Sequence, residues 1–213
     1  IFKKILSSKY AEEIKALLEY VSQGKELEYY TMGGTSFIFK AGDQVIKLGD
    51  KFDFEVPYHP RLMMPYFRQK YDTGVSLEVF NFANVGSAAG ITDEQLLEIY
   101  KELETAGIFW GDGKVENLGI LLKDNNLPDF IASKEFNVFG FLKDSRFPTT
   151  EHKVLPAGSI VVIDLDFIYA QEDPNRKTGA PSRIIRRYWK EQDRKKEKNR
   201  NMSNKYKERE YNE

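Results

Sequence analysis

The chain has 213 residues, with 32 Lys and Arg, 33 Asp and Glu, two His and no Cys, and its net charge is −1. The absence of Cys excludes disulfides and thiolate metal sites. Two His and a net charge near zero argue against a His-rich zinc site and against a polycationic protein. The 41% of apolar residues suffice for a core in one domain or two small lobes. No apolar run reaches the roughly 20 residues that span a bilayer and no secretory signal is visible, so we expect a cytoplasmic protein without a membrane partner.

The first half of the chain is predicted to form one helix followed by short strands. Apolar residues recur at helical spacing over Ser8–Gln23, and Gly24 would end that helix. Strand-like runs follow at Leu27–Tyr30, Ser36–Lys40, Gln44–Leu48 and Arg61–Phe67. Ala41-Gly42-Asp43 is typical of a hairpin turn between the second and third runs. Asn81–Gly90 is small and polar, so we expect a loop there.

The second half is predicted to contain one capped helix and two strands. Thr92 and Gln95 form the pattern of a capping box, and Gly107 would end the helix that follows. Its buried face would comprise Leu96, Leu97, Tyr100 and Leu103. Leu118–Leu122 and the β-branched run Ile160–Ile163 predict strands, the second buried on both faces. They bracket the insert 124–158, a candidate specificity element because long structured loops often carry function.

The final segment differs from the rest of the chain in charge. From Ser182 onward there are 12 Lys and Arg against 6 Asp and Glu. Arg183 to about Lys198 can form a helix, and the composition beyond it predicts a frayed or disordered tail. The residues expected to dock this helix are Ile184, Ile185, Tyr188 and Trp189. Its basic residues are candidates for nucleic-acid phosphates, although a solvated helix face is the favoured interpretation. They are Arg186, Arg187, Lys190, Arg194, Lys195, Lys196, Lys198 and Arg200.

The candidate catalytic residues lie in a tight loop between the capped helix and an apolar strand. Asp112, Lys114 and Asn117 suit a site that handles a hydroxyl proton, a phosphate and a divalent metal ion. Asp112 would accept the hydrogen bond and the proton of a substrate hydroxyl. Lys114 would offset charge that develops on a transferred phosphoryl group. Asn117, with Asp164 at the end of the buried strand, would supply hard oxygen ligands for Mg²⁺.

With these motifs, Tyr29 to Tyr169 resembles the protein-kinase-like superfamily, in a small and divergent form similar to atypical bacterial or phage-type kinases. The catalytic loop of that family has Asp, four residues, then Asn, and Asp112 and Asn117 match it, with Lys114 at the position of the protein-kinase Lys. Ile163-Asp164-Leu165-Asp166 is similar to the metal-binding element of the family. The resemblance implies ATP and Mg²⁺ as cofactors and Asn117, Asp164 and Asp166 as metal ligands.

The same resemblance assigns the residues that would bind the nucleotide. Gly33 and Gly34 are similar to the Gly-rich turn of the family, whose backbone approaches the phosphates closely. Lys47, on the next strand, would pair with the phosphates. Met64 and Tyr66 lie in a segment that resembles the hinge contacting adenine.

The fold that the resemblance implies is α+β and two-lobed. We expect a protein-kinase-like fold with a compressed N-lobe built on an antiparallel sheet and a mainly helical, minimal C-lobe. The expected bounds are 1–67 for the N-lobe, 68–181 for the C-lobe with its insert at 124–158, and 182–213 for the basic helix and tail.

The sequence departs from the family pattern in three places. No His or Arg directly precedes Asp112, and Asp166 stands where the family has Gly. The interval between Lys47 and Arg61 is too short for the helix whose Glu pairs with the Lys in this family. Two substitutes stay open, namely Glu55 in that interval or a Glu of the first helix packed in the missing helix's place. The residues of the second kind are Glu12, Glu13 and Glu19.

Together these residues predict an ATP-dependent phosphotransferase acting on a protein or small-molecule hydroxyl. The compressed N-lobe and the missing Glu favour an alternative, a pseudokinase that serves as a binding or scaffold module. Another alternative keeps the fold and transfers a nucleotidyl group. His59 and His152 receive no catalytic role, and Trp110 is expected to pack in the core rather than line the site.

Overall fold

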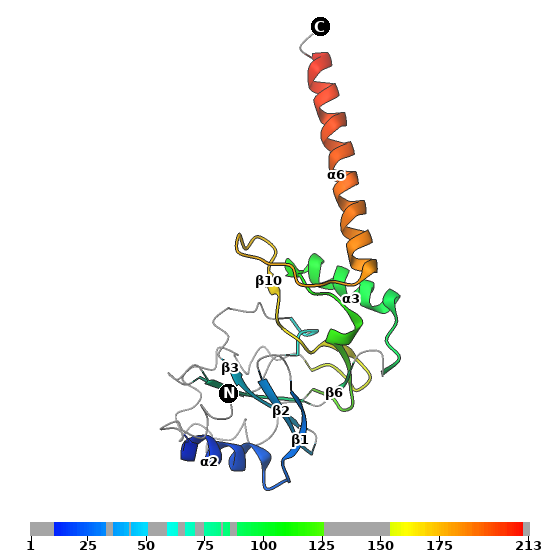
Figure 1. The fold of residues 1–213 in the computed structure, drawn as a ribbon. Coiled ribbons are helices and arrows are strands. Elements are labelled where there is room, and N and C mark those ends of the chain that lie inside the picture. The colour runs from blue at the N-terminus through cyan, green and yellow to red at the C-terminus, as the bar shows by residue number, and fades with distance from the viewer. Residues whose placement is uncertain are drawn as a thin grey trace.

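The computed structural model is α+β, with antiparallel sheets and a few helices. Figure 1 shows a sheet with helix α2 on one side, a second part built around helix α3 on the other, and helix α6 projecting from that second part. The structure describes residues 11–32, 36–42, 44–50, 59–63, 67–70, 75–81, 83–85, 89–125 and 154–210. Among the helices in these ranges, none is both long enough and apolar enough to cross a membrane.

The larger sheet has five strands in the order β1-β2-β3-β5-β4, and every neighbouring pair is antiparallel. The helix that precedes it is α2 (Ala11–Ser22). The strands are β1 (Glu28–Met32), β2 (Ser36–Ala41), β3 (Gln44–Asp50), β4 (Phe67–Lys70) and β5 (Val75–Asn81). Ile46, Leu48 and Leu77 are buried apolar residues of the two central strands β3 and β5.

The predicted hairpin between the second and third strands is confirmed. β2 and β3 pair with Ala41 opposite Gln44, so the connection has two residues. Gly42 has φ +60°, a left-handed backbone angle that glycine adopts without steric cost. The turn therefore fixes the register of β3, and with it the face of the sheet on which Lys47 lies.

The sheet continues past the predicted lobe boundary at residue 67, because β4 begins there and β5 ends at Asn81. Of the expected strand Arg61–Phe67, residues 64–66 lie outside the described residues; within 61–63 only Leu62 forms a bridge, to Val162, and Phe67 begins β4. Strand β5 was not expected at all. The predicted loop 81–90 is also wrong in part, because it contains strand β6 (Ala83–Val85).

The second part of the molecule packs two small sheets against α3 (Asp93–Thr105). The first sheet has the order β6-β8-β9, and the second pairs β7 with β10. Their remaining strands are β7 (Ile108–Trp110), β8 (Leu118–Leu121), β9 (Ile160–Val162) and β10 (Ile168–Ala170). The apolar core between them includes Trp110, which is fully buried, as expected.

The capping box predicted for α3 is confirmed. The Gln95 backbone N–H donates to the Thr92 hydroxyl oxygen over 3.3 Å, and the Thr92 N–H donates to the Gln95 side-chain oxygen over 2.9 Å. Gly107 follows the helix with φ +76°. On the buried face, Ile99 replaces the expected Leu97, which is only half-buried. The cap fixes where α3 begins and therefore which of its residues face the core.

Helix α6 (Arg183–Glu210) begins in the core and ends far from it. Ile185 is fully buried, and the Trp189 indole N–H donates to the Tyr100 hydroxyl over 2.7 Å. Burial raises the pKa of Tyr100 to about 12, although this hydrogen bond opposes the increase. The frayed tail expected beyond Lys198 is wrong, because the helix continues to Glu210. Lys, Arg and Glu are good helix formers and hold it without a core.

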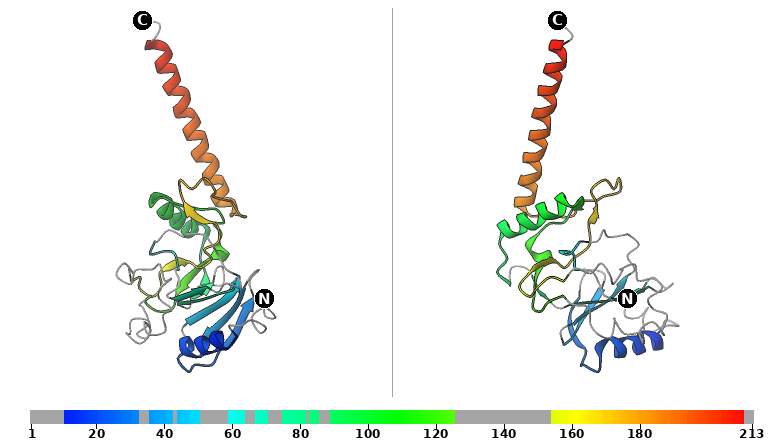
Figure 2. Two further views of the ribbon diagram at one scale, coloured as in Figure 1. Left: turned by 90° about the vertical axis from the view of Figure 1, so that its left-hand side faces the viewer. Right: turned by 180° about the vertical axis from the view of Figure 1, so that it is seen from behind.

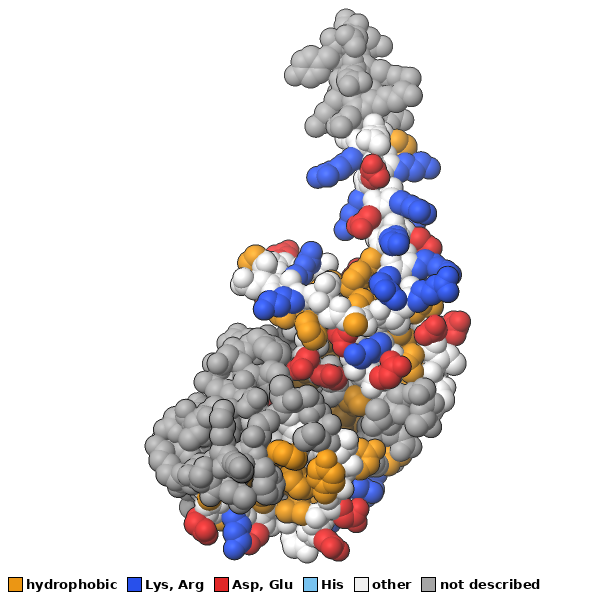
Figure 3. All heavy atoms as spheres, viewed as in Figure 1, with side chains coloured by type: hydrophobic (Ala, Val, Ile, Leu, Met, Phe, Trp, Pro, Cys, Tyr) orange, Lys and Arg blue, Asp and Glu red, His pale blue; other side chains and the backbone are white. Residues whose placement is uncertain are grey.

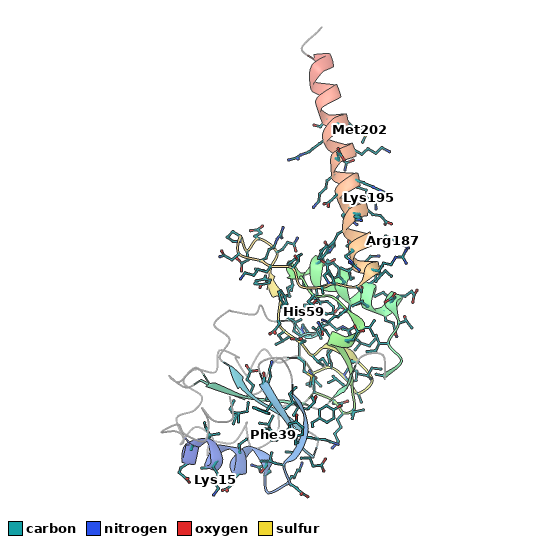
Figure 4. All side chains as sticks on the ribbon, viewed as in Figure 1. Lys15, Phe39, His59, Arg187, Lys195 and Met202 are labelled. Carbon is teal, nitrogen blue, oxygen red and sulfur yellow. The ribbon has the colours of Figure 1, made fainter. Side chains whose placement is uncertain are left out.

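The two additional views in Figure 2 also show α6 projecting away from the rest of the molecule. Figure 4 labels Arg187, Lys195 and Met202 in ascending order along its length. From Arg194 to Ser203 every side chain is exposed. This part of the helix presents its side chains to solvent rather than to the body of the protein.

We predict that Ile185→Ala will lower the free energy of unfolding by about 2–5 kcal/mol, because it leaves a cavity where α6 enters the core. Met202→Ala is the matched control on the same helix, since Met202 is 45% exposed, and it should change stability by less than about 0.5 kcal/mol. Urea unfolding of both variants measures the difference. Similar values for the two would mean that α6 is not part of the folded core.

Candidate active site

Asp112 lies in the loop that follows β7, and its side chain is nearly buried, with 6% exposed. Three donors converge on its carboxylate. The Lys114 ammonium lies 2.8 Å from Oδ2, and Nδ2 of Asn117 donates to the same oxygen over 3.0 Å. The Ala180 backbone N–H donates to Oδ1 over 2.6 Å. The loop therefore brings together Asp112, Lys114 and Asn117, as the sequence predicted.

The third donor comes from the segment 177–182, which lies directly against the loop. The Gly179 N–H donates to the Gly111 carbonyl over 3.0 Å, and the Ser182 N–H donates to the Gly113 carbonyl over 2.8 Å. A Cβ on Gly179 would lie 2.7 Å from Oδ1 of Asp112, and one on Gly111 would lie 2.2 Å from the Lys177 carbonyl oxygen. Both glycines are therefore needed for this close approach.

The charges in this loop stabilise one another. Burial raises the pKa of the Asp112 carboxyl, but the hydrogen bonds from Lys114, the Ala180 amide and Asn117 outweigh burial and bring the pKa below its usual value. The hydrogen bond to Asp112 raises the pKa of the Lys114 ammonium, and the charge of Asp164 adds to the increase. At neutral pH the pair is therefore an ionised carboxylate and a protonated amine.

The antiparallel pairing of β8 and β9 brings Asn117 close to Asp164. Asn117 directly precedes β8 and Asp164 follows β9, and the Ile163 N–H donates to the Asn117 carbonyl over 3.0 Å. Beyond them the Asp166 N–H donates to Oδ1 of Asp164 over 3.1 Å, which forms a tight turn. The predicted metal-binding residues are thus adjacent in the fold although they are far apart in sequence.

Phe167, the residue after Asp166, has an unusual backbone conformation. Its φ is +64°, which is uncommon for a residue with a side chain. Its carbonyl accepts a hydrogen bond from the Gly111 N–H over 2.8 Å. Phe167 therefore ties the segment that carries Asp164 and Asp166 to the loop that carries Asp112. Backbone strain of this kind often occurs at functional sites.

The five-stranded sheet contributes charged residues to the same region. Burial and the neighbouring charge of Asp164 raise the pKa of Asp166 above its usual value. Lys47 of β3 acts in the opposite direction, and Glu78 of β5 adds to the increase. These effects mean that Lys47 and Glu78 lie within electrostatic range of Asp166. In Figure 3, acidic side chains gather between the sheet and the part that carries α3.

Asn117, Asp164 and Asp166 fit a divalent cation chemically. Burial raises the pKa of Asp166 most, and repulsion from the neighbouring Asp164 carboxylate raises it further. A cation bound between them would relieve that repulsion. Both side-chain hydrogen bonds of Asn117 use Nδ2, so Oδ1 is the atom of its amide that would ligate. Within the described residues, no three His, Cys, Asp or Glu side chains form a metal-binding group by themselves.

Four predicted ligands of the nucleotide, Gly33, Gly34, Met64 and Tyr66, lie outside the described residues. The chain passes from the five-stranded sheet to the second part between Asn81 and Ala83, and Leu62, at the start of the proposed hinge segment, packs in the core of the second part. His59, which received no catalytic role, accepts a hydrogen bond from the Arg61 N–H at Nδ1.

Glu78 is the charged residue that the sequence analysis missed. It is 3% exposed and lies directly opposite Lys47 in the register of β3 and β5. Of the carboxylates proposed to pair with Lys47, Glu12 and Glu19 are exposed on α2, and Glu55 lies outside the described residues, as does the side chain of Glu13. A sequence signal existed, since Val75, Leu77 and Val79 alternate as in a strand and Glu78 falls between them.

No protein-family model matches this chain, and no curated protein matches it either.

We predict that Asp112→Asn will lower the free energy of unfolding at pH 7 by roughly 1.5–3 kcal/mol, because Lys114 and Asn117 lose an ionised acceptor. The native pKa of Asp112 is depressed, so its stabilising contribution is present above the unfolded pKa of about 3.9 and is lost as pH falls through the native value. The difference between wild type and variant should therefore shrink below about pH 4.

Urea unfolding at several pH values measures this difference, with Asp193→Asn as the control. Asp193 is exposed on α6, so the same loss of charge there should change little at any pH. A difference of the same size at pH 7 and pH 3 would mean that the charge of Asp112 is not what stabilises the loop.

Proposed function

We propose that this protein is an ATP-dependent phosphotransferase of the protein-kinase-like type, acting on a hydroxyl of a protein or a small molecule. The observation that carries the proposal is that the two parts of the molecule bring charged and polar side chains into one electrostatically coupled group. The five-stranded sheet contributes Lys47. The second part contributes Asp112, Lys114, Asn117, Asp164 and Asp166. Phosphoryl transfer is catalysed mainly by positioning and by electrostatic stabilisation, and this group supplies both. The two-lobed fold is part of the same proposal.

Asp112 is suited to orient the acceptor hydroxyl. An ionised carboxylate has about four acceptor positions, and Lys114, Asn117 and Ala180 occupy three of them. The remaining position on Oδ1 can accept a hydroxyl hydrogen. Because the pKa of Asp112 is lowered, the carboxylate is a weak base, and its contribution is to align the hydroxyl and take up its proton late in the transfer.

Lys114 and Lys47, which come from the two parts of the molecule, are suited to stabilise phosphate charge. Lys114 keeps its proton through Asp112, so its positive charge is available where negative charge develops on a transferred group. Lys47 would bind the phosphates of ATP from the sheet. Mg²⁺ would neutralise phosphate oxygens, held by Asn117, Asp164 and Asp166.

A nucleotide-binding module without turnover is the second candidate, and the burial of Asp112 favours it. The carboxylate is only 6% exposed and the segment 177–182 lies against it, which restricts the approach of an acceptor. The two candidates share the same nucleotide ligands and differ only at Asp112. Measured transfer of the γ-phosphoryl group to any acceptor separates them. A nucleotidyl transferase would instead release pyrophosphate.

We predict that ATP with Mg²⁺ will raise the thermal unfolding midpoint by several degrees. A ligand at 100 times its dissociation constant adds about 2.7 kcal/mol, and each kcal/mol shifts the midpoint of a chain this size by about 2–4 °C. Asp164→Asn should abolish the metal-dependent part of the shift, whereas Asp193→Asn on α6 should keep it. No shift at millimolar ATP, or an equal shift without Mg²⁺, would contradict the proposal.

The basic face of α6 supports contact with nucleic acid as a further candidate function. Arg187, Lys190, Arg194 and Lys198 are exposed and recur at three- and four-residue spacing, so they form one stripe along the projecting helix. Glu191 lies four residues after Arg187 and three before Arg194, so one acidic side chain shares this face with the four cations. A straight row of cations that the body does not cover suits the evenly spaced phosphates of a strand.

We predict that replacing these four cations with Gln will weaken RNA or DNA binding and flatten its salt dependence, since each phosphate contact contributes roughly 0.7–0.9 to the logarithmic slope. The matched control replaces four cations on the other sides of α6, namely Arg186, Lys195, Lys196 and Arg200. Fluorescence anisotropy at several salt concentrations measures both. If both sets of substitutions weaken nucleic-acid binding equally, the binding is unspecific charge attraction and does not depend on the stripe.

A further inference from the structure

Glu78 is a buried carboxylate in the middle of a sheet. Its strand, β5, lies between β3 and β4, and only 3% of the residue is exposed. An ionised carboxylate in such a place loses its hydration, which costs several kcal/mol unless a cation and hydrogen bonds compensate. A buried Glu in a central strand therefore implies a cationic partner held close to it.

The register of the sheet puts Lys47 in that position. β3 and β5 pair without interruption from Gln44 opposite Asn81 to Asp50 opposite Val75, and Lys47 is directly opposite Glu78. Opposed residues in an antiparallel pair point to the same face, with Cβ atoms about 4.5–5.5 Å apart. The neighbours Ile46 and Leu48 are buried on the other face. Lys47 and Glu78 therefore share one face of the sheet.

The charges of Lys47 and Glu78 also act on Asp166 in the second part of the molecule. After burial and Asp164, the charges of Lys47 and Glu78 are the next largest influences on the pKa of Asp166. Lys47 is thus the register partner of one carboxylate and acts electrostatically on another. Glu78 comes from its own sheet, and Asp166 comes from the second part of the molecule.

We propose that Glu78 is a positioning residue, which holds the Lys47 ammonium in the orientation that binds the phosphates of a nucleotide. The inference rests on the proposed function, in which Lys47 is the phosphate ligand. Glu12 and Glu19 of α2 are exposed, and Figure 1 shows α2 on the side of the sheet away from α3. A neighbouring strand, rather than a helix, supplies the carboxylate.

A pair within one sheet differs physically from a pair between a sheet and a helix. The hydrogen bonds between β3 and β5 fix the spacing of Lys47 and Glu78, so no helix has to move for them to meet. The nucleotide site is therefore assembled whenever the sheet is folded. A switch that acts by displacing a helix from the Lys has no place in this arrangement.

Arg68 of β4 is the other cation to be considered, because it is the register partner of Glu78 on the opposite edge of β5. If Glu78 served only to pair with Arg68, its loss would lower stability without changing the reactivity of the Lys47 amine. The test therefore follows Lys47 itself and uses Arg68→Gln as the matched control.

The first measurement is the acylation rate of the Lys47 amine in the full chain, followed by mass spectrometry without nucleotide. Glu78→Gln should raise this rate severalfold, because the amine loses its charged partner, whereas Arg68→Gln should leave it unchanged. An unchanged rate in Glu78→Gln overturns the inference. Glu78→Asp keeps the charge and is the variant to use if Glu78→Gln does not fold; its rate should stay near that of wild type.

The second measurement is the dissociation constant of ATP with Mg²⁺ in a double-mutant cycle. Glu78→Gln should weaken binding about tenfold in the wild-type background and have no further effect in Lys47→Met. A loss of ATP affinity of the same size in both backgrounds would mean that Glu78 does not act through Lys47, and it would overturn the inference. If the wild type itself binds no ATP, the proposed function is overturned, and the acylation rate alone decides whether the Lys47–Glu78 pair exists.

Discussion

The buried carboxylate of Asp112 joins three parts of the chain that are distant in sequence. Lys114 binds it from the same loop, Asn117 from the start of β8, and the Ala180 amide from the segment that leads into α6. A buried carboxylate without partners is strongly unfavourable, so these three donors stabilise the charge of Asp112. Gly111 and Gly179 make this approach sterically feasible. The loop 111–117 and the start of α6 are thereby fixed together.

Two of the acidic groups of the candidate site, Asp112 and Asp166, differ in their electrostatic surroundings. Donors surround Asp112 and lower its pKa, whereas burial and a second carboxylate raise the pKa of Asp166. Environments that separate the pKa values of neighbouring acids commonly mark a division of roles. The hydrogen bonds to Asp112 favour its ionised form, whereas burial and Asp164 disfavour the ionised form of Asp166.

Local sequence patterns predicted the elements that local interactions determine. The Thr92 capping box, the turn at Gly42 and the Asp112–Asn117 loop depend on neighbours a few residues apart, and the structure has all three. By contrast, β7 and β10 are three-residue strands stabilised by partners some 60 residues away, and neither was expected. Such pairings depend on the tertiary fold, which a short window of sequence does not contain.

The error at Glu78 had a related cause. The run Val75–Asn81 was not recognised as a strand, so the lobe boundary was drawn before it and Glu78 was left out of the site. Lys47 was found because the resemblance to protein kinases directs attention to it, but that resemblance also directed the search for its partner to helices. Cross-strand register identifies the opposite residue, and register becomes known only when β3 and β5 are seen to pair.

The insert between β8 and β9 leaves and returns at the same point. The Asn125 N–H donates to the Leu155 carbonyl, the Leu155 N–H donates to the Asn125 side chain, and the Ala157 N–H donates to the Asp124 carboxylate. These bonds close the base of the loop independently of its interior. Because doubling the length of a loop costs only about 0.6 kcal/mol, the sequence between them is free to diverge or lengthen during evolution with little loss of stability.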